Sequence, residues 1–235
     1  MANARFFRIC AVSIVAGAVL ALVANVIHPD LPIGVRDAHA LIASRGDWRG
    51  THLAIIVAAL LLAFGFAGIT CACAGSGSGI GRLGLLSIAV GTSVVAVSIG
   101  IDGFAEKTLA DAWASAAAAQ KAPYLTASMA IQLIHVGLFY VWAGIFWGVS
   151  FILYGWAMLE SRAFPAWLGW IACVGGLLVC IATAAQYLSP HDSVEISLRI
   201  LLLLESLWAI ALGWFMWRVP AGAIEHALNR KAEVV

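Results

Sequence analysis

Six long apolar stretches constrain the fold of this chain more than any other feature. A transmembrane helix needs roughly 20 mostly apolar residues, and each stretch is about that long or longer. We therefore predict an all-α, polytopic membrane protein, with a bundle of six transmembrane helices over residues 6–27, 52–72, 83–105, 127–159, 164–188 and 196–217. The fourth stretch is too long for a perpendicular crossing, so we expect it to tilt or to project from the bilayer.

Composition supports a lipid environment and argues against nucleic-acid partners. Hydrophobic residues make up 63% of the 235 residues and charged residues only 11%, whereas soluble domains are roughly 45–50% apolar and about 25% charged. The lipid bilayer is thus the predicted partner of a single transmembrane domain over residues 1–235. The formal net charge of +1 leaves no basic patch that would neutralise the phosphates of a nucleic acid.

The sequence contains no motif for nucleotide binding or for a serine hydrolase. Neither G-x-x-x-x-G-K-[ST] nor G-x-S-x-G occurs in it. Residues 75–81 are rich in glycine, but they form a short connection between two predicted spans rather than a strand-to-helix turn. We therefore expect no bound nucleotide.

The first span has a second interpretation, as a secretory signal. Arg5 and Arg8 precede its apolar run, and residues 19–21 fit a cleavage site. The charge-free run from Ile9 to Ile27 is nevertheless long enough to cross a membrane, and it carries a patterned stripe that a disposable signal does not need. We expect the span to be retained.

Positively charged residues near the ends of the spans indicate the orientation. The two shortest connections, near residues 75–81 and 161–163, carry Arg82 and Arg162 close to span ends, where the positive-inside rule counts most. With the N-terminus inside, Arg230 and Lys231 are also cytoplasmic. We therefore predict that both termini are cytoplasmic.

Two longer connections on the opposite side have amphipathic patterns. Residues 29–50 place apolar side chains at helical spacing, at Val35, Ala38, Leu41 and Ile42. Residues 106–120 do the same with Leu109, Trp113 and Ala116, so we expect the third span to continue as a helix above the membrane until Pro123 closes it. These short helices either cover the mouth of the bundle or lie on the lipid surface.

Small residues recur along one face of several spans. Transmembrane helices associate through such residues and through hydrogen bonds between helices. The stripes are Ser13, Gly17, Ala21 and Asn25; Gly84, Gly91, Ser98 and Asp102; Cys173, Gly176, Cys180, Thr183 and Tyr187; and Glu205, Ala209 and Gly213. The outer half of the stripes holds the polar members, while the inner half holds mainly small residues, which favours a closed pocket over a polar path through the membrane.

The imidazole and carboxyl groups inside the spans gather on one side of the membrane. In a serial bundle, the C-terminal ends of odd spans and the N-terminal ends of even spans share a face. We select Glu205, His135 and Asp102 as candidate catalytic residues. The candidate ligand-binding residues are Gln132, Tyr187, Glu106 and Asn25. Glu205 is the sharpest outlier, because a charge at bilayer depth costs about 2.5–3.5 kcal/mol.

A transition-metal site is one use of these groups. Its candidate ligands are His135, His52, His28, Asp102 and Glu205. Imidazoles with carboxylates suit zinc, iron or copper, although the ligands come singly from separate helices and no H-x-x-x-H motif supports them. Haem between His52 and His135 is disfavoured, because the two residues differ in depth by roughly 10 Å.

Simpler roles remain open for the same residues. Glu205 and His135 can be hydrogen-bonded packing residues, and His28 and His52 can be solvated at the membrane interface. We expect Glu195 and Arg199 to pair at i, i+4. The other three histidines, which are His39, His191 and His226, are expected to be exposed.

One stretch resembles a known kind of protein. Residues 102–113, together with His52 and Leu53 before them, are similar to small polytopic bacterial membrane proteins of uncharacterised function. The resemblance implies a bacterial inner-membrane location and brings no activity or cofactor with it.

Three functions are consistent with these observations. The first is a polar pocket in the outer half of the bundle that binds a metal or a small ligand, including the case of a membrane-embedded enzyme. The second is an accessory subunit that docks another membrane subunit through its stripes. The third is a small-solute or proton-coupled transporter, for which the sequence shows no clear inverted repeat.

Overall fold

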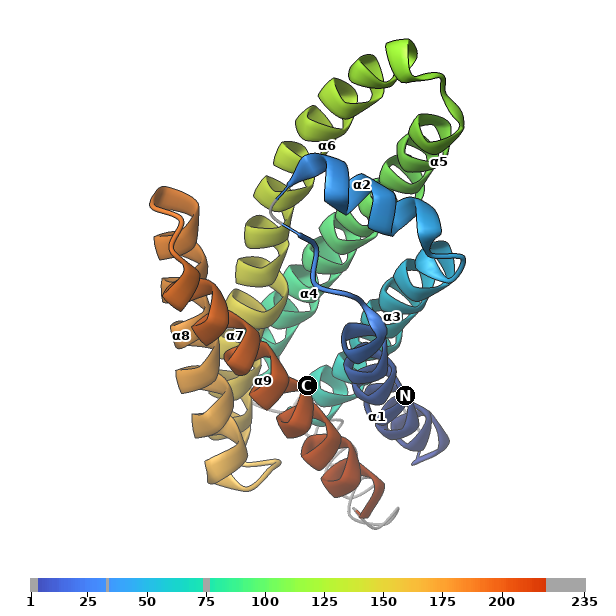
Figure 1. Ribbon diagram of the computed structural model, residues 1–235. Coiled ribbons are helices and arrows are strands. Elements are labelled where there is room, and N and C mark those ends of the chain that lie inside the picture. The colour runs from blue at the N-terminus through green and yellow to red at the C-terminus, as the bar shows by residue number, and fades with distance from the viewer. Residues whose placement is uncertain (1–3, 33, 74–76, 219–235) are drawn as a thin grey trace.

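The structure is built from helices. The computed structural model describes residues 4–32, 34–73 and 77–218, and within these ranges it contains helices and short connections but no strand (Figure 1). Six segments of the described chain are long and apolar enough to cross a membrane: α1 (Ala4–Ile27), α3 (Trp48–Ala72), Gly77–Ser115, Ala118–Ser161, α8 (Ala166–Leu188) and α9 (Asp192–Arg218). The predicted all-α, six-span architecture of a multi-pass membrane protein is confirmed.

The third and fourth spans are each a chain of joined helices, and the expected continuation of the third span as a helix beyond residue 105 is present. The third consists of α4 (Gly77–Gly100), the π-helix η1 (Ile101–Glu106) and α5 (Lys107–Ser115). The fourth consists of the short 3-10 helix η2 (Ala118–Gln120), α6 (Lys121–Ala143), the π-helix η3 (Gly144–Val149) and α7 (Ser150–Ser161). At 39 and 44 residues, both exceed the roughly 20 residues of a crossing.

The ends of these long spans stand above the rest of the bundle, as expected for the fourth. In Figure 1, α5 and the first half of α6 rise together and α2 (Val35–Ser44) lies across them. The prediction that Pro123 closes the third span is wrong. That helix ends at Ser115, and Pro123 lies in the first turn of α6, where a missing backbone N–H is tolerated.

Small residues bring the helices close together, as the stripes predicted. A Cβ placed on Gly17 of α1 would lie 2.8 Å from the carbonyl oxygen of Ala58 in α3. A Cβ on Gly176 of α8 would lie 2.5 Å from the carbonyl oxygen of Gly148 in η3. Around these contacts a continuous apolar core forms, with the rings of Phe66, Tyr154 and Trp208 near its centre.

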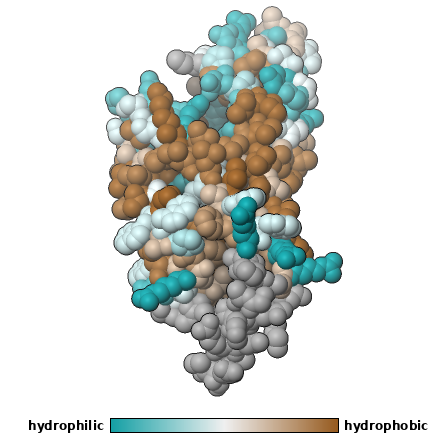
Figure 2. All heavy atoms as spheres, turned by 90° about the horizontal axis from the view of Figure 1, so that it is seen from below, coloured by the Kyte–Doolittle hydropathy of each residue, from teal (hydrophilic) through white to brown (hydrophobic). Residues whose placement is uncertain are grey.

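The outer surface of the bundle is apolar. Each candidate span exposes large apolar side chains, for example Val19, Leu60, Leu86, Leu133, Leu177 and Leu203. Figure 2 shows broad areas of such side chains on the face seen from below. A large exposed apolar surface is what a lipid-facing bundle requires, because it would be unfavourable in water.

The helix α2 packs on protein and does not lie free on the lipid surface. Its Ile42 is buried in a small apolar cluster with Trp48 of α3 and Ala110 of α5. His39, which we expected to be exposed, is fully buried, so that expectation is wrong. His191 is exposed, as expected, whereas His226, Arg230, Lys231 and residues 75–76 lie outside the described residues.

Candidate metal centre

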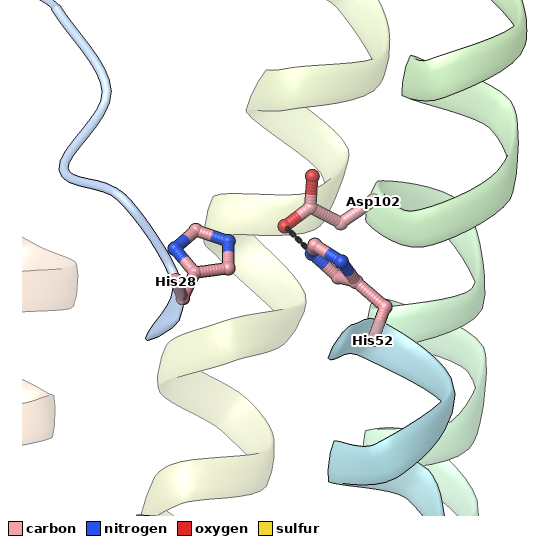
Figure 3. Close-up of side chains that lie close together, drawn as sticks. All are labelled: His28, His52 and Asp102. Atoms are coloured by element: carbon pink, nitrogen blue, oxygen red, sulfur yellow. Dashed lines mark hydrogen bonds and ion pairs between the residues drawn. The ribbon is translucent and has the colours of Figure 1, made fainter. Parts of the chain in front are cut away.

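Four side chains from four segments converge near the end of the bundle that α2 covers. His52 lies in the second turn of α3, Asp102 in η1 and His135 in α6, while His28 directly follows α1. The Nε2 atom of His52 is 3.0 Å from Oδ2 of Asp102, and the Nε2 atom of His135 is 3.5 Å from the same oxygen. Figure 3 shows His28, His52 and Asp102 pointing toward one another.

A backbone carbonyl determines which nitrogen of His52 carries a proton. The Nδ1 atom lies 2.7 Å from the carbonyl oxygen of Trp48. Because a carbonyl only accepts hydrogen bonds, this contact requires a proton on Nδ1. A neutral His52 therefore turns the lone pair of Nε2 toward the carboxylate of Asp102.

His135 has the same arrangement on the other side of Asp102. Its Nδ1 atom lies 3.1 Å from the carbonyl oxygen of Ser98 and 3.1 Å from the hydroxyl of the same residue. When Nδ1 donates to the carbonyl, Nε2 of a neutral ring keeps its lone pair; when the Ser98 hydroxyl donates to Nδ1, Nε2 carries the proton. In both cases Nε2 faces Oδ2 of Asp102. Histidines that bind metals commonly donate their second ring nitrogen in this way, which fixes the orientation of the ring.

His28 completes the group from the connection that follows α1. His28, His52 and Asp102 each offer one ligand atom, and these three atoms lie within 4.8 Å of one another. The His28 ring packs against the rings of Trp48 and His52, with 5.0 Å between centroids in both cases. Burial lowers the pKa of His28 below 6.5, and the nearby His52 acts in the same direction, so the neutral, ligating form is favoured.

Two residues that hold this geometry were not singled out from the sequence. Trp48 donates its indole N–H to the backbone carbonyl of Asp102 at 3.1 Å. A Cβ on Gly103 would lie 2.4 Å from the Cβ of His52, so only glycine permits this approach of η1 to α3. The π-helical turn at η1 was also not predicted, and such turns occur frequently at functional sites.

Comparison with known proteins places the chain in a family. The model of a family described as "Domain of unknown function (DUF4386)" matches residues 9–219, which include all four converging side chains. The chain belongs to the DUF4386 family. No curated protein and no solved structure matches it. The family description carries no activity, so the function of this DUF4386 chain has to be argued from its own residues.

A second buried polar group lies next to the first in this DUF4386 chain. The Ser128 hydroxyl of α6 donates a hydrogen bond to Oε2 of Glu106 and lies 3.2 Å from Nδ1 of His39. All three side chains are buried, and neither Nε2 of His39 nor Oε1 of Glu106 has a hydrogen-bond partner among the described residues. Burial lowers the pKa of His39 below 6.5. The group ties α2 to η1 and α6.

The other predicted site residues do not join the four. Asn25 is exposed and donates to the carbonyl of Ala21 on its own helix. Tyr187 is 61% exposed, and Gln132 is half-buried on α6. Glu205 is buried against Gly175 of α8, and its carboxylate forms no hydrogen bond with any described residue. The DUF4386 chain thus separates Glu205 from the cluster that contains Asp102 and His135.

The predicted pair of Glu195 and Arg199 is present. Nη2 of Arg199 lies 2.8 Å from Oε1 of Glu195, and Nη1 lies 2.7 Å from Oδ1 of Asp30. The contact with Asp30 was not predicted. It connects the segment after α1 to α9 on the same side of the bundle as His28.

Proposed function

We propose that this protein binds a divalent transition metal, with zinc as the best match, through His52, His135, Asp102 and His28. One observation carries the proposal: two imidazoles, each with Nδ1 within 3.1 Å of a backbone carbonyl oxygen, direct their Nε2 atoms at the same carboxylate oxygen, an arrangement of ligand atoms that suits a metal ion. When both Nε2 atoms are unprotonated, their lone pairs and the carboxylate repel one another, and a metal ion between them removes that repulsion.

The distances between the donor atoms support a metal. Two ligand atoms of one tetrahedral zinc ion, each about 2.0 Å from the metal, lie about 3.3 Å apart. The separations of 3.0 Å and 3.5 Å from Asp102 to the two histidines lie on either side of that value. Three nitrogens and one oxygen are also a ligand set that zinc commonly takes.

Protons are the competing source of positive charge. One added proton can lie between Asp102 and either His52 or His135, but not between Asp102 and both. When both Nδ1 atoms donate to their carbonyls, satisfying both contacts with protons requires two imidazolium ions beside one carboxylate in a buried site, with His28 adjacent. A single divalent ion satisfies both contacts at once and avoids that excess of buried charge.

The position of His28 favours an accessible centre. It is half-buried and follows α1 in a non-helical connection, whereas His52 and Asp102 are buried in helical segments. In this proposal His28 is the fourth ligand that water can replace. A zinc-bound water is acidic enough to act near neutral pH, so the centre suits hydrolysis of an ester or amide bond in an amphiphilic substrate.

The location of the protein is part of the proposal. We place it as one transmembrane domain in the bacterial inner membrane with both termini cytoplasmic, which puts the metal centre on the outer side. The support is the positive charge of Arg82 and Arg162 at the opposite ends of the spans. Reaction of a single cysteine introduced at Ser193 with an impermeant maleimide on intact cells tests the orientation.

Metal content of the purified protein tests the central claim. The wild-type chain, stripped with a chelator and exposed to zinc, should retain one ion per chain by elemental analysis. His52→Ala and His135→Ala should each retain far less, while His191→Ala, which changes an exposed histidine, should behave as wild type. A wild-type chain that retains no metal above the level of His52→Ala contradicts the proposal.

Hydrolysis is tested separately. Wild-type protein in detergent should cleave a fluorogenic medium-chain ester, lose that activity with a chelator and regain it with zinc. Failure to cleave esters and amides by a chain that retains its metal would leave metal binding intact and reject the hydrolytic role.

A further inference from the structure

Glu205 occupies a buried position in the middle of its span. It lies halfway along α9, which runs from Asp192 to Arg218, and only 4% of its surface is exposed. Neither carboxylate oxygen has a hydrogen-bond partner among the described residues. A carboxyl group at this depth is unfavourable unless it carries a proton or faces a positive partner.

The carboxyl group lies at a cavity between α8 and α9. The cavity has a volume of about 400 Å³ and is also lined by Phe151 of α7. Gly175 of α8 leaves room for the carboxylate, since a Cβ there would lie 3.1 Å from Oε1 of Glu205. A volume in this range is typical of sites for small molecules.

The cavity is reached from the lipid-facing side of the bundle. Trp170 and Leu204, which line it, are 60% and 54% exposed on the outer surface of the helices. Among the described lining residues, Glu205 is the one that can carry a charge. Trp208, also in the lining, donates its indole N–H to the carbonyl of Leu168 at 3.0 Å, so that donor is not directed at Glu205.

We propose that this cavity binds a membrane-soluble amine, with the ammonium group on Glu205 and the hydrocarbon tail along the apolar wall. The ammonium supplies both the positive charge and the N–H donors that the carboxylate lacks. Trp170 and Trp208 also line the cavity and provide aromatic surface, to which a cation is attracted. A ligand that reaches the cavity through lipid must be largely apolar, which an alkylamine is.

The site is separate from the metal centre and does not depend on it. Glu205 lies on α9 and faces α8, whereas the four proposed metal ligands come from the end of α1 and from α3, η1 and α6. Loss of amine binding and loss of metal binding are therefore distinguishable in one preparation.

Binding of dodecylamine to the protein in lipid nanodiscs tests the proposal, with dodecanol and dodecanoate as matched probes. Native mass spectrometry should detect the bound amine and much less of the alcohol or the acid. Glu205→Gln should weaken amine binding at least tenfold without changing zinc content. Glu160→Gln, which neutralises an exposed carboxylate on α7, should bind the amine as wild type does.

A protection experiment on the unaltered chain covers the case in which Glu205→Gln does not fold. A hydrophobic carbodiimide should label Glu205, and dodecylamine, but not dodecanol, should prevent the labelling. Three results would overturn the proposal: equal binding of amine and alcohol, wild-type amine affinity in a folded Glu205→Gln variant, or a co-purified membrane subunit that shields Glu205 in place of the amine.

Discussion

Asp102 and Glu205 are both buried carboxyl groups within apolar helices, but their surroundings differ. Asp102 faces imidazoles from two other helices at 3.0 and 3.5 Å, with a third histidine beside them. Glu205 faces an apolar cavity and has no described partner. Both lie within long apolar helices, where an isolated charge is unfavourable, so the difference lies in what surrounds each group.

This difference indicates what each site is organised to receive. The imidazoles around Asp102 provide several potential ligand atoms, which suit a metal ion. The surroundings of Glu205 present hydrocarbon and aromatic rings, which call for one positive group attached to an apolar body. A carboxyl group alone does not distinguish these cases, and its neighbours do.

The largest effect should follow from removing Asp102. Zinc at about 1,000 times its Kd stabilises a folded protein by about 4 kcal/mol, and Asp102→Ala should lose most of that stabilisation because the carboxylate joins both histidines. Thermal unfolding in detergent, with and without zinc, measures the effect. Asp192→Ala, at an exposed acid, is the control. If zinc stabilises Asp102→Ala as much as it stabilises the wild type, Asp102 is not a zinc ligand.

Replacing Glu205 should change stability with the opposite sign. Glu205→Leu exchanges a buried carboxyl without a partner for an apolar group, which removes the cost of about 1–3 kcal/mol for burying a polar group without a hydrogen bond. The same unfolding measurement should therefore show a higher transition temperature and an unchanged response to zinc. If Glu205→Leu instead abolishes the zinc response, the two carboxyl groups belong to one site.

The end of the bundle at which a polar residue lies could be predicted from the sequence, but its exact depth could not. Where a residue falls within its apolar stretch, together with the alternating direction of the spans, predicted that His28, His52, Asp102 and His135 share one end. The structure brings His28, His52 and Asp102 together and places His135 beside Asp102. The expected difference of roughly 10 Å in depth between His52 and His135 does not hold for their side chains, because both Nε2 atoms lie within 3.5 Å of one oxygen of Asp102. The small-residue stripes likewise predicted close helix contacts, because only small side chains permit them.

Rotation about each helix axis could not be predicted in the same way. Asn25 and Tyr187 have the expected polarity at the ends of their spans but are exposed, and Glu205 faces α8 rather than the histidines. The burial of His39 depends on α2 docking onto α5 and α6, a tertiary contact that has no local sequence signal. The π-helical turn that presents Asp102 is equally invisible in a hydropathy pattern.

The glycine after Asp102 allows the geometry of the cluster to be disturbed without altering a ligand. Gly103→Ala places a Cβ 2.4 Å from the Cβ of His52, and overpacking of this kind costs about 1–3 kcal/mol. Zinc affinity, measured by titration calorimetry, should fall as η1 moves away from α3. Gly100→Ala is the matched control, because nothing lies within 4 Å of its Cβ. Equal zinc affinities for the two variants would show that the contact does not position His52.

The smallest effect concerns α2, whose buried His39 makes its docking dependent on pH. Because burial lowers the pKa of His39 below its usual 6.5, the unfolded chain binds a proton more readily than the folded one. The stabilisation is complete above about pH 6.5 and is lost as the pH falls through the lower pKa of the folded state. Protonating Nε2 would also bury an N–H that has no acceptor among the described residues. Other ionisable groups on or beside these elements are Arg36 and Asp37 on α2, Asp102 and Glu106 on η1, Lys107 and Asp111 on α5, and the neighbouring Arg49 and Lys121.

Hydrogen exchange of α2 at about pH 7.5 and about pH 5.5 measures this opening. After each exchange rate is divided by the intrinsic rate at the same pH, the amides of α2 should be less protected at the lower pH. His39→Gln retains every other titrating group, so the ratio of the exchange rates of wild type and variant isolates the effect of the histidine. The pH dependence specific to α2 should disappear in the variant. Persistence of that dependence in His39→Gln would assign it to another titrating group near α2 instead of His39. The zinc content should be the same at both pH values, because the hydrogen bond and the ring contact of His39 are with Ser128 and Trp113 and not with the four proposed ligands. In that case α2 acts as a cover that opens while the metal centre beneath it stays assembled.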